Sequence, residues 1–390
     1  MRFATLPPLS LYVHLPWCLR KCPYCDFNSY EARGAVPEDA YVDALLRDLH
    51  AELPFAQGRA LCSIFLGGGT PSLFSGDAIR RLLAGIRARL PLHADTEITL
   101  EANPGAAEAE RFAAYREAGV NRLSIGVQSF RDAQLEALGR VHSAAEAVRA
   151  VELARRAGFD EVNLDLMYGL PGDDPEAALA DLETAAALEP THLSWYELTL
   201  EPGTAFHRRP PPRPDEDVVL EIESRGRERL AARGFGRYEV SAYARPGHRC
   251  VHNLNYWQFG DYLGIGAGAH GKLTLGAEAS RELGGSQAIV RRAKTRNPRT
   301  FMQTAGSPAA VTVERIEEPR QAVLEFMMNA LRLPDGVDAD CFEQRTGQPL
   351  AAVEQPLAEA ERRGWLRLEQ RRVTPTAEGL RALNRVLQLF

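Results

Sequence analysis

The sequence has few cysteines, no long apolar run and no excess of positive charge. Its 390 residues include 6 cysteines, and no run of about 18 apolar residues that would span a membrane is found. The N-terminal segment 1–8 lacks the apolar stretch of a secretory signal. A formal net charge of −6 argues against general electrostatic binding to nucleic acid. These absences predict a cytoplasmic protein whose cysteines stay reduced.

Half of the cysteines lie in one short stretch. Cys18, Cys22 and Cys25 fall within eight residues in the spacing C-x-x-x-C-x-x-C, directly after the strand-like run Ser10–Pro16. We therefore expect them on a loop at the carboxyl end of a buried strand, where α/β proteins place their chemistry.

Three interpretations of these thiols are open. A structural zinc site usually takes four ligands in two separated pairs, but Cys62, Cys250 and Cys341 are scattered singly. A disulfide framework is not expected in a chain of this length without a secretory signal. A cuboidal iron–sulfur cluster normally takes four protein thiolates, so three would leave one iron open to a small molecule. We favour the cluster and keep a zinc-binding interaction protein as an alternative.

Strand-like and helix-like segments alternate through the first two thirds of the chain. Six such units predict a parallel sheet with right-handed crossovers. Because a closed barrel needs eight units, six predict an incomplete, open barrel or a doubly wound sheet. The expected strands are Leu11–Leu15, Ser63–Leu66, Glu97–Glu101, Arg122–Val127, Glu161–Met167 and His192–Leu198. The expected helices are Pro37–Leu53, Gly76–Leu90, Ala107–Ala118, Ala144–Ala157, Pro175–Leu188 and Glu216–Arg233.

Polar and glycine residues gather where these strands end. The run Gly67–Ser72 lets a ligand approach the backbone, although it is equally typical of an ordinary turn. Glu101 ends the third strand, where it would alternatively cap a helix. Gln128 ends the fourth strand, and the following Arg140 can grip a carboxylate, although such arginines are often merely solvated. Asp165 lies among apolar residues of the fifth strand and needs a partner such as a ribose diol, a helix N-terminus or an arginine.

Together these motifs, over residues 8–272, resemble the anaerobic coproporphyrinogen oxidase family of the radical S-adenosylmethionine (SAM) superfamily. The resemblance favours the open barrel, an incomplete (βα)6 TIM-like α/β fold. It implies a [4Fe–4S] cluster on Cys18, Cys22 and Cys25, with SAM chelating the fourth iron. The residues expected around SAM are Tyr12, Tyr24, Gly68, Gly69, Thr70, Glu101, Gln128, Arg140 and Asp165.

Two features are similar to the heme chaperone branch of that family. The oxidase carries a further cysteine two residues after the third and a long extension before the motif; here that position is Phe27, and 17 residues precede Cys18. The run His252-Asn253-Leu-Asn-Tyr256-Trp257 resembles the H-N-x-x-Y-W run of the chaperones. An imidazole can ligate heme iron and aromatic faces can pack on a porphyrin. Without the resemblance, His252 would be interpreted as a hydrogen-bonded core histidine.

The last part of the chain differs in pattern. Helices are expected at Pro319–Leu331, Asp338–Arg345, Ala351–Arg363 and Ala377–Leu389, and short strands at Trp365–Leu368 and Arg372–Thr374. This order predicts a small winged-helix-like α+β domain. Because acidic residues interleave with its cations, we favour a lid or a partner-docking role over DNA binding. The expected division is 1–240 for the radical SAM core, 241–316 for an extension with the HNxxYW run, and 317–390 for this domain.

The resemblance thus implies a heme chaperone that binds heme and passes it to an acceptor hemoprotein. It implies an electron donor for the cluster, and it leaves room for a homodimer. A respiratory acceptor would bring at most peripheral membrane contact, and no nucleic acid is expected. The alternative is an oxygen-independent coproporphyrinogen III oxidase, a radical SAM enzyme that decarboxylates two propionates; whether the chain catalyses a reaction or cleaves SAM stays open.

Overall fold

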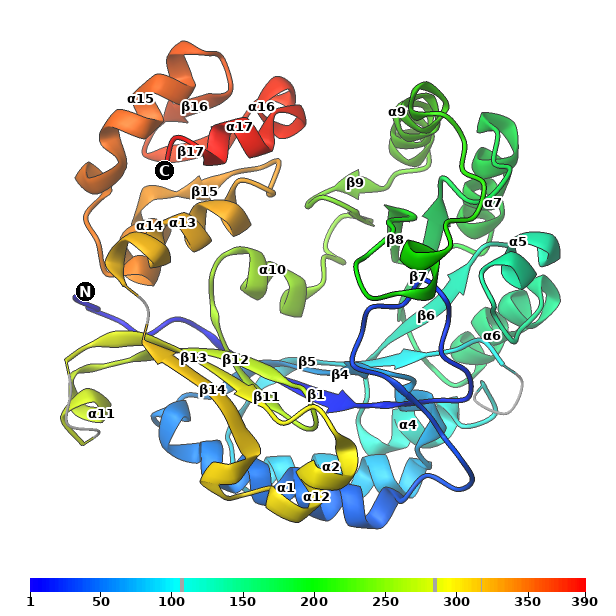
Figure 1. Cartoon of the computed structure of the whole chain (residues 1–390), viewed down its shortest axis with the longest axis horizontal. Coiled ribbons are helices and arrows are strands. Elements are labelled where there is room, and N and C mark those ends of the chain that lie inside the picture. Colours follow the sequence, from blue (N-terminus) through cyan, green and yellow to red (C-terminus); the bar gives the residue numbers. More distant parts are fainter. Residues whose placement is uncertain (106–108, 283–285, 317) are drawn as a thin grey trace.

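A large mixed sheet forms the centre of the molecule in the computed structural model, which describes residues 1–105, 109–282, 286–316 and 318–390 (Figure 1). Within these residues one sheet contains twelve strands. In spatial order they are β14 (Val311–Ile316), β13 (Ala288–Lys294), β12 (His270–Leu275), β11 (Asp261–Ile265), β1 (Leu9–Leu15), β4 (Leu61–Gly68), β5 (Leu92–Ala102), β6 (Arg122–Gln128), β7 (Glu161–Tyr168), β8 (His192–Glu197), β10 (Ala242–Ala244) and β9 (Gly236–Arg237). Two short strands, β2 (Trp17–Cys18) and β3 (Tyr30–Glu31), pair separately.

Six neighbouring strands of this sheet, β1 and β4 to β8, pair in parallel and in chain order. They are the six strands expected from the sequence, and the predicted fold class is confirmed. The largest difference is at β5, which begins at Leu92 rather than Glu97.

Helices cover the outer face of these parallel strands (Figure 1). Several are started by side-chain caps: Ser75 accepts a hydrogen bond from the Ala78 N–H, and Ser143 and Glu146 form a capping box. The predicted helix at 107–118 begins outside the described residues and is seen from Phe112. The helices are α1 (Glu38–Ala56), α2 (Gly76–Arg87), α4 (Phe112–Ala118), α5 (Asp132–Ala137), α6 (Ala144–Arg156), α7 (Pro175–Ala187), α8 (Ala205–Arg208) and α9 (Glu216–Ala232), with the 3₁₀ turn η1 (Pro71–Leu73).

The two faces of each parallel strand differ in chemistry. Outward side chains such as Leu123, Ile125 and Leu164 are fully buried against the helices. The alternate positions, such as Ser124 and Asn163, point into the interior of the partial barrel and line a pocket. The fold therefore surrounds a polar interior with an apolar shell.

Residues 251–316 widen the sheet beyond β1, whereas β10 pairs with β8 on the other side. Helix α10 (Val251–Trp257) is followed by β11, which pairs in parallel with β1, and then by three antiparallel strands. Helices α11 (Ala277–Glu282) and α12 (Pro298–Thr304) and the turn η2 (Pro308–Ala310) connect them. A buried ion cluster, in which Lys294 donates to Asp48 at 2.7 Å and to Glu52 at 2.5 Å, ties β13 to α1.

The C-terminal part forms a second core beside the barrel. It contains α13 (Pro319–Ala330), β15 (Val337–Asp338), α14 (Ala339–Thr346), η3 (Leu350–Val353), α15 (Glu354–Arg362), β16 (Leu366–Glu369), β17 (Arg372–Pro375), α16 (Ala377–Arg381) and α17 (Leu383–Leu387). Its three strands form a small antiparallel sheet: β16 and β17 match the two strands that we predicted, and β15 is a third that we did not. The single last helix that we predicted is split into α16 and α17.

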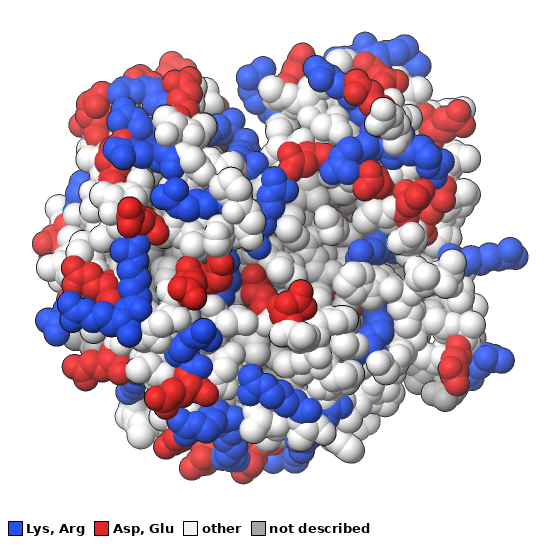
Figure 2. All heavy atoms as spheres, turned by 180° about the vertical axis from the view of Figure 1, so that it is seen from behind, with Lys and Arg blue, Asp and Glu red and all other residues white. Residues whose placement is uncertain are grey.

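A groove separates this C-terminal part from the lobe that carries α9, and Figure 2 shows it from behind. Cations and anions are interleaved on the face seen there, without a broad basic patch. The ion pair of Arg249 with Asp335, 2.7 Å long, joins the segment before α10 to the C-terminal part. No helix in the described part of the chain is long and apolar enough to cross a membrane.

Candidate functional site

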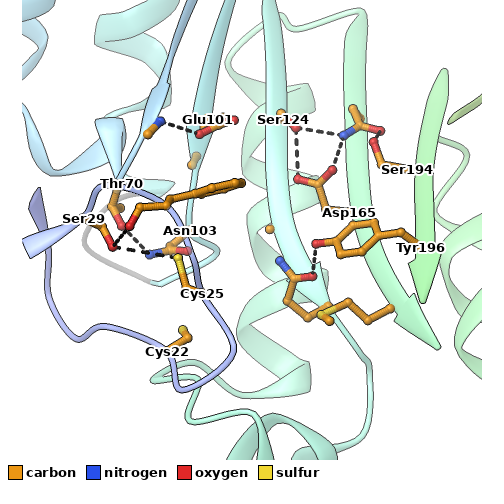
Figure 3. Close-up of a pocket in the computed structure, with 18 of the residues that line it drawn as sticks. Cys22, Cys25, Ser29, Thr70, Glu101, Asn103, Ser124, Asp165, Ser194 and Tyr196 are labelled. Atoms are coloured by element: carbon orange, nitrogen blue, oxygen red, sulfur yellow. Dashed lines mark hydrogen bonds between the residues drawn. The ribbon is translucent and has the colours of Figure 1, made fainter. Parts of the chain in front are cut away.

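A cavity of about 460 Å³ opens at the carboxyl ends of the parallel strands and continues into the barrel. It brings together most of the residues that the sequence predicted for the cluster and for SAM. Those lining it are Cys18, Cys22, Cys25, Tyr24, Gly68, Gly69, Thr70, Glu101, Gln128, Arg140 and Asp165, and Asn253 of the HNxxYW run lines it too. Figure 3 shows Glu101, Asp165 and Tyr196 pointing into one space from three different strands.

The cysteine loop lies at the mouth of this cavity. Strands β2 and β3 hold its ends, and the Ala32 N–H donates to the Cys18 carbonyl at 2.9 Å. All three thiols are free and partly exposed, and burial raises the pKa of the Cys18 and Cys25 thiols. Among the described residues, no group of Cys, His, Asp or Glu is arranged to hold a single metal ion.

The glycine run packs against this loop. A side chain on Gly69 would bring its Cβ within 2.6 Å of the Trp17 carbonyl oxygen, so the position requires glycine. The Gly69 and Thr70 N–H groups donate to the carbonyls of Leu15 and Trp17, at 2.8 and 2.7 Å. Since these donors are engaged, the turn offers a ligand its carbonyl oxygens, which suit an amine.

Arg140 connects the loop to the strands. It donates through Nη2 to Asn103 Oδ1 at 2.5 Å and to the Gly126 carbonyl at 2.8 Å, and its Nη1 lies 3.7 Å from Cys22 Sγ. Its buried Nε has no hydrogen-bond partner in the part of the chain that the structure describes. Asn103 also donates to Thr70 Oγ1 at 3.1 Å. The thiol of Cys22 thus lies beside a fixed cation at the mouth of the cavity.

Two carboxyl groups face the cavity from β5 and β7, the strands on either side of β6. Glu101 accepts a hydrogen bond from the Gly68 N–H at 3.1 Å, and Asp165 accepts from Ser124 Oγ at 3.1 Å and Asn163 Nδ2 at 2.8 Å. Burial, followed by repulsion from Asp165, raises the pKa of Glu101 to about 8. Burial also raises the pKa of Asp165. Such a pair suits a ligand that combines positive charge with hydroxyl groups.

Gln128 has a left-handed backbone, with φ of 70°, and its Oε1 accepts from the Tyr196 hydroxyl at 2.8 Å. A carboxylate on α7 holds the turn that follows. Asp181 accepts from Ser129 Oγ at 2.6 Å, from the Phe130 N–H at 2.9 Å and from Arg131 Nε at 3.2 Å. This network stabilises a conformation that a non-glycine residue rarely adopts.

Tyr12 lies behind the site rather than on its wall. Its hydroxyl is 3.0 Å from His14 Nδ1, and the His14 ring packs beneath Gly68. The structure therefore gives Tyr12 a supporting position, one contact away from the cavity.

The predicted heme residues are divided between the interior and the surface. The His252 ring is covered by protein although the residue keeps some exposure; its Nδ1 is 2.9 Å from Ser63 Oγ, and its ring centroid is 4.9 Å from that of Phe65. Burial lowers the pKa of His252 to about 4. Asn253 lines the cavity, Trp257 packs against the C-terminal core, and Tyr256 is exposed.

Several cavity residues were not expected from the sequence. They are Asn103, Ser124, Asn163, His192, Ser194 and Tyr196. Asn103 directly follows the end of β5, and the others are inward-facing positions on β6, β7 and β8. Each lies two positions along the chain from another residue that lines the cavity. Polar residues that alternate with apolar ones along four adjacent strands are the signal that identifies them.

The partial barrel and its three-cysteine loop define a class of protein. The Radical SAM superfamily model matches residues 12–185, and the HemN C-terminal domain model matches residues 318–381. The structure of coproporphyrinogen III oxidase (HemN) from Escherichia coli aligns with a TM-score of 0.81, covering 98% of this chain and 90% of that one at 24% identity. That likeness establishes the fold.

Sequence similarity identifies the family within this class. Heme chaperone HemW of Escherichia coli (strain K12) is 50% identical over 99% of this chain and 98% of that protein, and HemW of Haemophilus influenzae is 46% identical over 99% and 98%. Mitochondrial radical S-adenosyl methionine domain-containing protein 1 of Mus musculus is 37% identical over 97% of this chain and 86% of that protein. The chain belongs to the HemW family of the radical SAM superfamily, which confirms the predicted resemblance. Membership of the superfamily implies a [4Fe–4S] cluster and SAM as cofactors.

Proposed function

We propose that this protein is a heme chaperone, which binds heme and passes it to an acceptor hemoprotein. The observation that carries the proposal is the 50% identity, over nearly the whole of both chains, to a protein named heme chaperone HemW. Its test is a transfer assay in which the heme-loaded protein is mixed with an apo-hemoprotein. Heme should appear in the acceptor under conditions where the acceptor competes poorly for free hemin; no transfer would contradict the proposal.

Within this proposal the cavity holds the cluster and SAM. When bound, the two would supply an electron step or a 5′-deoxyadenosyl radical. Cys18, Cys22 and Cys25 would bind three irons, and the glycine carbonyls would accept from the amino group of SAM. Asp165, already held by Ser124 and Asn163, would accept hydrogen bonds from the ribose.

The Asp181 network should matter for SAM and not for the cluster. Asp181→Asn removes the negative charge that holds Ser129, Phe130 and Arg131, so the turn carrying Gln128 should loosen. We expect SAM affinity to fall roughly tenfold, as for the loss of one charge-assisted hydrogen bond. Iron and sulfide content should not change, since the cysteine loop makes none of these contacts.

SAM binding is measured by equilibrium dialysis on anaerobically reconstituted protein. Asp160→Asn, at an exposed position at the end of the α6–β7 connection, is the matched control and should bind like the wild type. Unchanged SAM affinity in Asp181→Asn would show that Gln128 does not depend on this network.

We propose that heme binds at the HNxxYW segment, with His252, Asn253, Tyr256 and Trp257 as its residues. His252→Ala should weaken hemin binding several-fold, because it removes the Ser63 hydrogen bond and the Phe65 contact that fix α10. Absorbance titration with hemin measures the effect. Equal, weak binding by wild type and variant would contradict heme binding at this segment.

The alternative function is that of an oxygen-independent coproporphyrinogen III oxidase. The shared fold with HemN supports this alternative, while Phe27, in place of the further cysteine of the oxidase, counts against it. An anaerobic assay with reconstituted cluster, SAM and coproporphyrinogen III decides between the two. Formation of protoporphyrinogen would favour the oxidase; SAM binding without turnover would favour the chaperone.

A further inference from the structure

His252 is only partly exposed and is engaged by the barrel wall, so we ask which other residue of this segment meets heme iron. Its Nδ1 contacts Ser63, and its ring lies on Phe65 in the barrel wall. In addition, the Val251 and His252 N–H groups each donate to the Glu97 carboxylate at 3.0 Å, which fixes the first turn of α10 to β5. These contacts hold the backbone, the Nδ1 atom and one ring face of His252 against the barrel wall.

The other end of the same helix is accessible. Tyr256 is 41% exposed, and its hydroxyl makes no hydrogen bond within the described residues. Its ring packs edge-on against Trp257, with centroids 5.2 Å apart, and its centroid lies 5.5 Å from that of the partly buried Tyr262 ring. Tyr256 is therefore held by its neighbours while its phenol stays free to bind a ligand.

Helix α13 of the C-terminal part contributes the rest of this surface. Asn329 donates to the Tyr256 carbonyl at 3.4 Å, which sets α13 beside the end of α10. Met328 is 40% exposed, whereas its neighbour Met327 is buried in the core. An exposed methionine on the helix that lies beside the end of α10 offers an apolar contact for a flat ligand.

A cation completes the set. The guanidinium of Arg332 lies 5.3 Å from the centre of the Trp257 ring, and its Nε donates to the Met328 carbonyl at 3.0 Å. In the described part of the chain Arg332 forms no ion pair, although many other arginines here do. A cation held in place without an anion is suited to a carboxylate such as a porphyrin propionate.

We propose that ferric heme binds on the α10–α13 face, formed by Tyr256, Trp257, Met328 and Arg332, with the Tyr256 phenolate as its axial ligand. As the iron–oxygen bond forms, the phenol proton leaves to solvent and the iron stays ferric. Met328 contacts the porphyrin plane, Arg332 pairs with a propionate, and Trp257 supports both. Tyrosine is an established axial ligand of ferric heme. This inference depends on the proposed heme binding and gives His252 the role of a positioning residue.

Both domains contribute to this face, since α10 follows the barrel strands and α13 begins the C-terminal part (Figure 1). A change in their relative position would separate Tyr256 from Met328 and Arg332 and weaken the hold on heme. The face thus fits a carrier that must also release its cargo.

The test is a hemin titration of the full chain, followed by absorbance and electron paramagnetic resonance. Wild type should give a high-spin ferric spectrum, and Tyr256→Phe should lose it and bind at least about tenfold more weakly. His252→Ala should keep the spectrum at reduced affinity, and Met328→Leu, which loses the thioether but keeps an apolar side chain, should keep the spectrum. A spectrum that survives in Tyr256→Phe and disappears in His252→Ala or Met328→Leu would overturn the assignment.

The propionate contact is tested with hemin and its dimethyl ester. Arg332→Gln should weaken hemin binding roughly fivefold and leave ester binding unchanged, as expected for the loss of one partly exposed ion pair. Arg381→Gln, an exposed arginine on α16, is the control and should behave like the wild type. Equal losses for hemin and ester would overturn the role of Arg332. If the wild type fails to bind hemin at all, the proposed heme binding itself is wrong. If the wild type binds hemin and Tyr256→Phe binds it equally well, heme binding stands and only the assignment of Tyr256 as axial ligand is wrong.

Discussion

Cys22→Ser should abolish assembly of the iron–sulfur cluster. The protein supplies three thiols in one loop, and a cluster with one iron already open to a small molecule cannot lose a second protein ligand and stay bound. Cys22 is also the thiol that lies 3.7 Å from the Arg140 guanidinium, so the substitution removes this contact as well. After anaerobic reconstitution, the Cys22→Ser variant should contain iron and acid-labile sulfide only near background, and it should lack the brown colour of the wild type.

Cys341→Ser serves as the matched control. Cys341 is a free, partly buried cysteine in the C-terminal part, where its thiol contacts the Gln258 carbonyl. This variant should reconstitute like the wild type, and circular dichroism should show both variants folded. Full iron and sulfide in Cys22→Ser, or zinc in place of iron in the wild type, would contradict a three-cysteine cluster.

The sequence predicted the parallel strands because their signal is local. Each is a short apolar run followed by glycine or polar residues and then by an amphipathic helix, and burial on both faces makes such runs visible. The cysteine loop was equally accessible, because the spacing of Cys18, Cys22 and Cys25 is itself the motif. The three cysteines follow the first parallel strand, and the carboxyl ends of parallel strands meet at one edge of a sheet, so their position at the mouth of the cavity could be predicted as well.

Contacts between distant segments were beyond the sequence. The burial of His252 depends on Ser63, 189 positions earlier, and on Phe65 of the same strand. The pairing of β11 with β1 likewise joins segments that are about 250 positions apart in the chain, and no local pattern in the sequence indicates it. Apolar periodicity indicates that a segment is buried, but it does not identify the partner that buries it.

The inner wall of the cavity is an intermediate case. Ser124, Asn163 and Ser194 sit two residues from other lining positions, so strand alternation was sufficient to find them. They were missed because each strand was interpreted as an apolar run with a polar end. Their hydrogen bonds to Asp165 and to one another show how this part of the inner wall keeps its polar side chains paired.

Binding of SAM should strengthen with pH through Glu101. Its pKa of about 8, raised by burial and then by Asp165, keeps this carboxyl largely protonated at neutral pH. A ligand with a permanent sulfonium charge binds the ionised form better, so affinity should rise with pH until Glu101 is ionised and then level off. Between pH 6 and pH 8 the ionised fraction grows about 50-fold, which sets the largest expected gain. Equilibrium dialysis of SAM across this range measures it.

Glu101→Gln separates this effect from titration of SAM itself. The amino group of SAM ionises equally with both proteins, so the difference between the two pH profiles belongs to Glu101. Both proteins also keep the other charged and titratable groups of the site, which are Asp165, Tyr12 and Arg140. The contribution of these groups to SAM affinity is therefore common to both pH profiles.

The pH dependence of stability gives an independent check of the sign. The folded protein binds the Glu101 proton more tightly than the unfolded chain, whose value is 4.5, so wild-type stability should fall as pH rises from 4.5 towards 8. Glu101→Gln should lack that decline in stability. If SAM affinity changes with pH in the same way for wild type and Glu101→Gln, Glu101 does not contact the sulfonium of SAM.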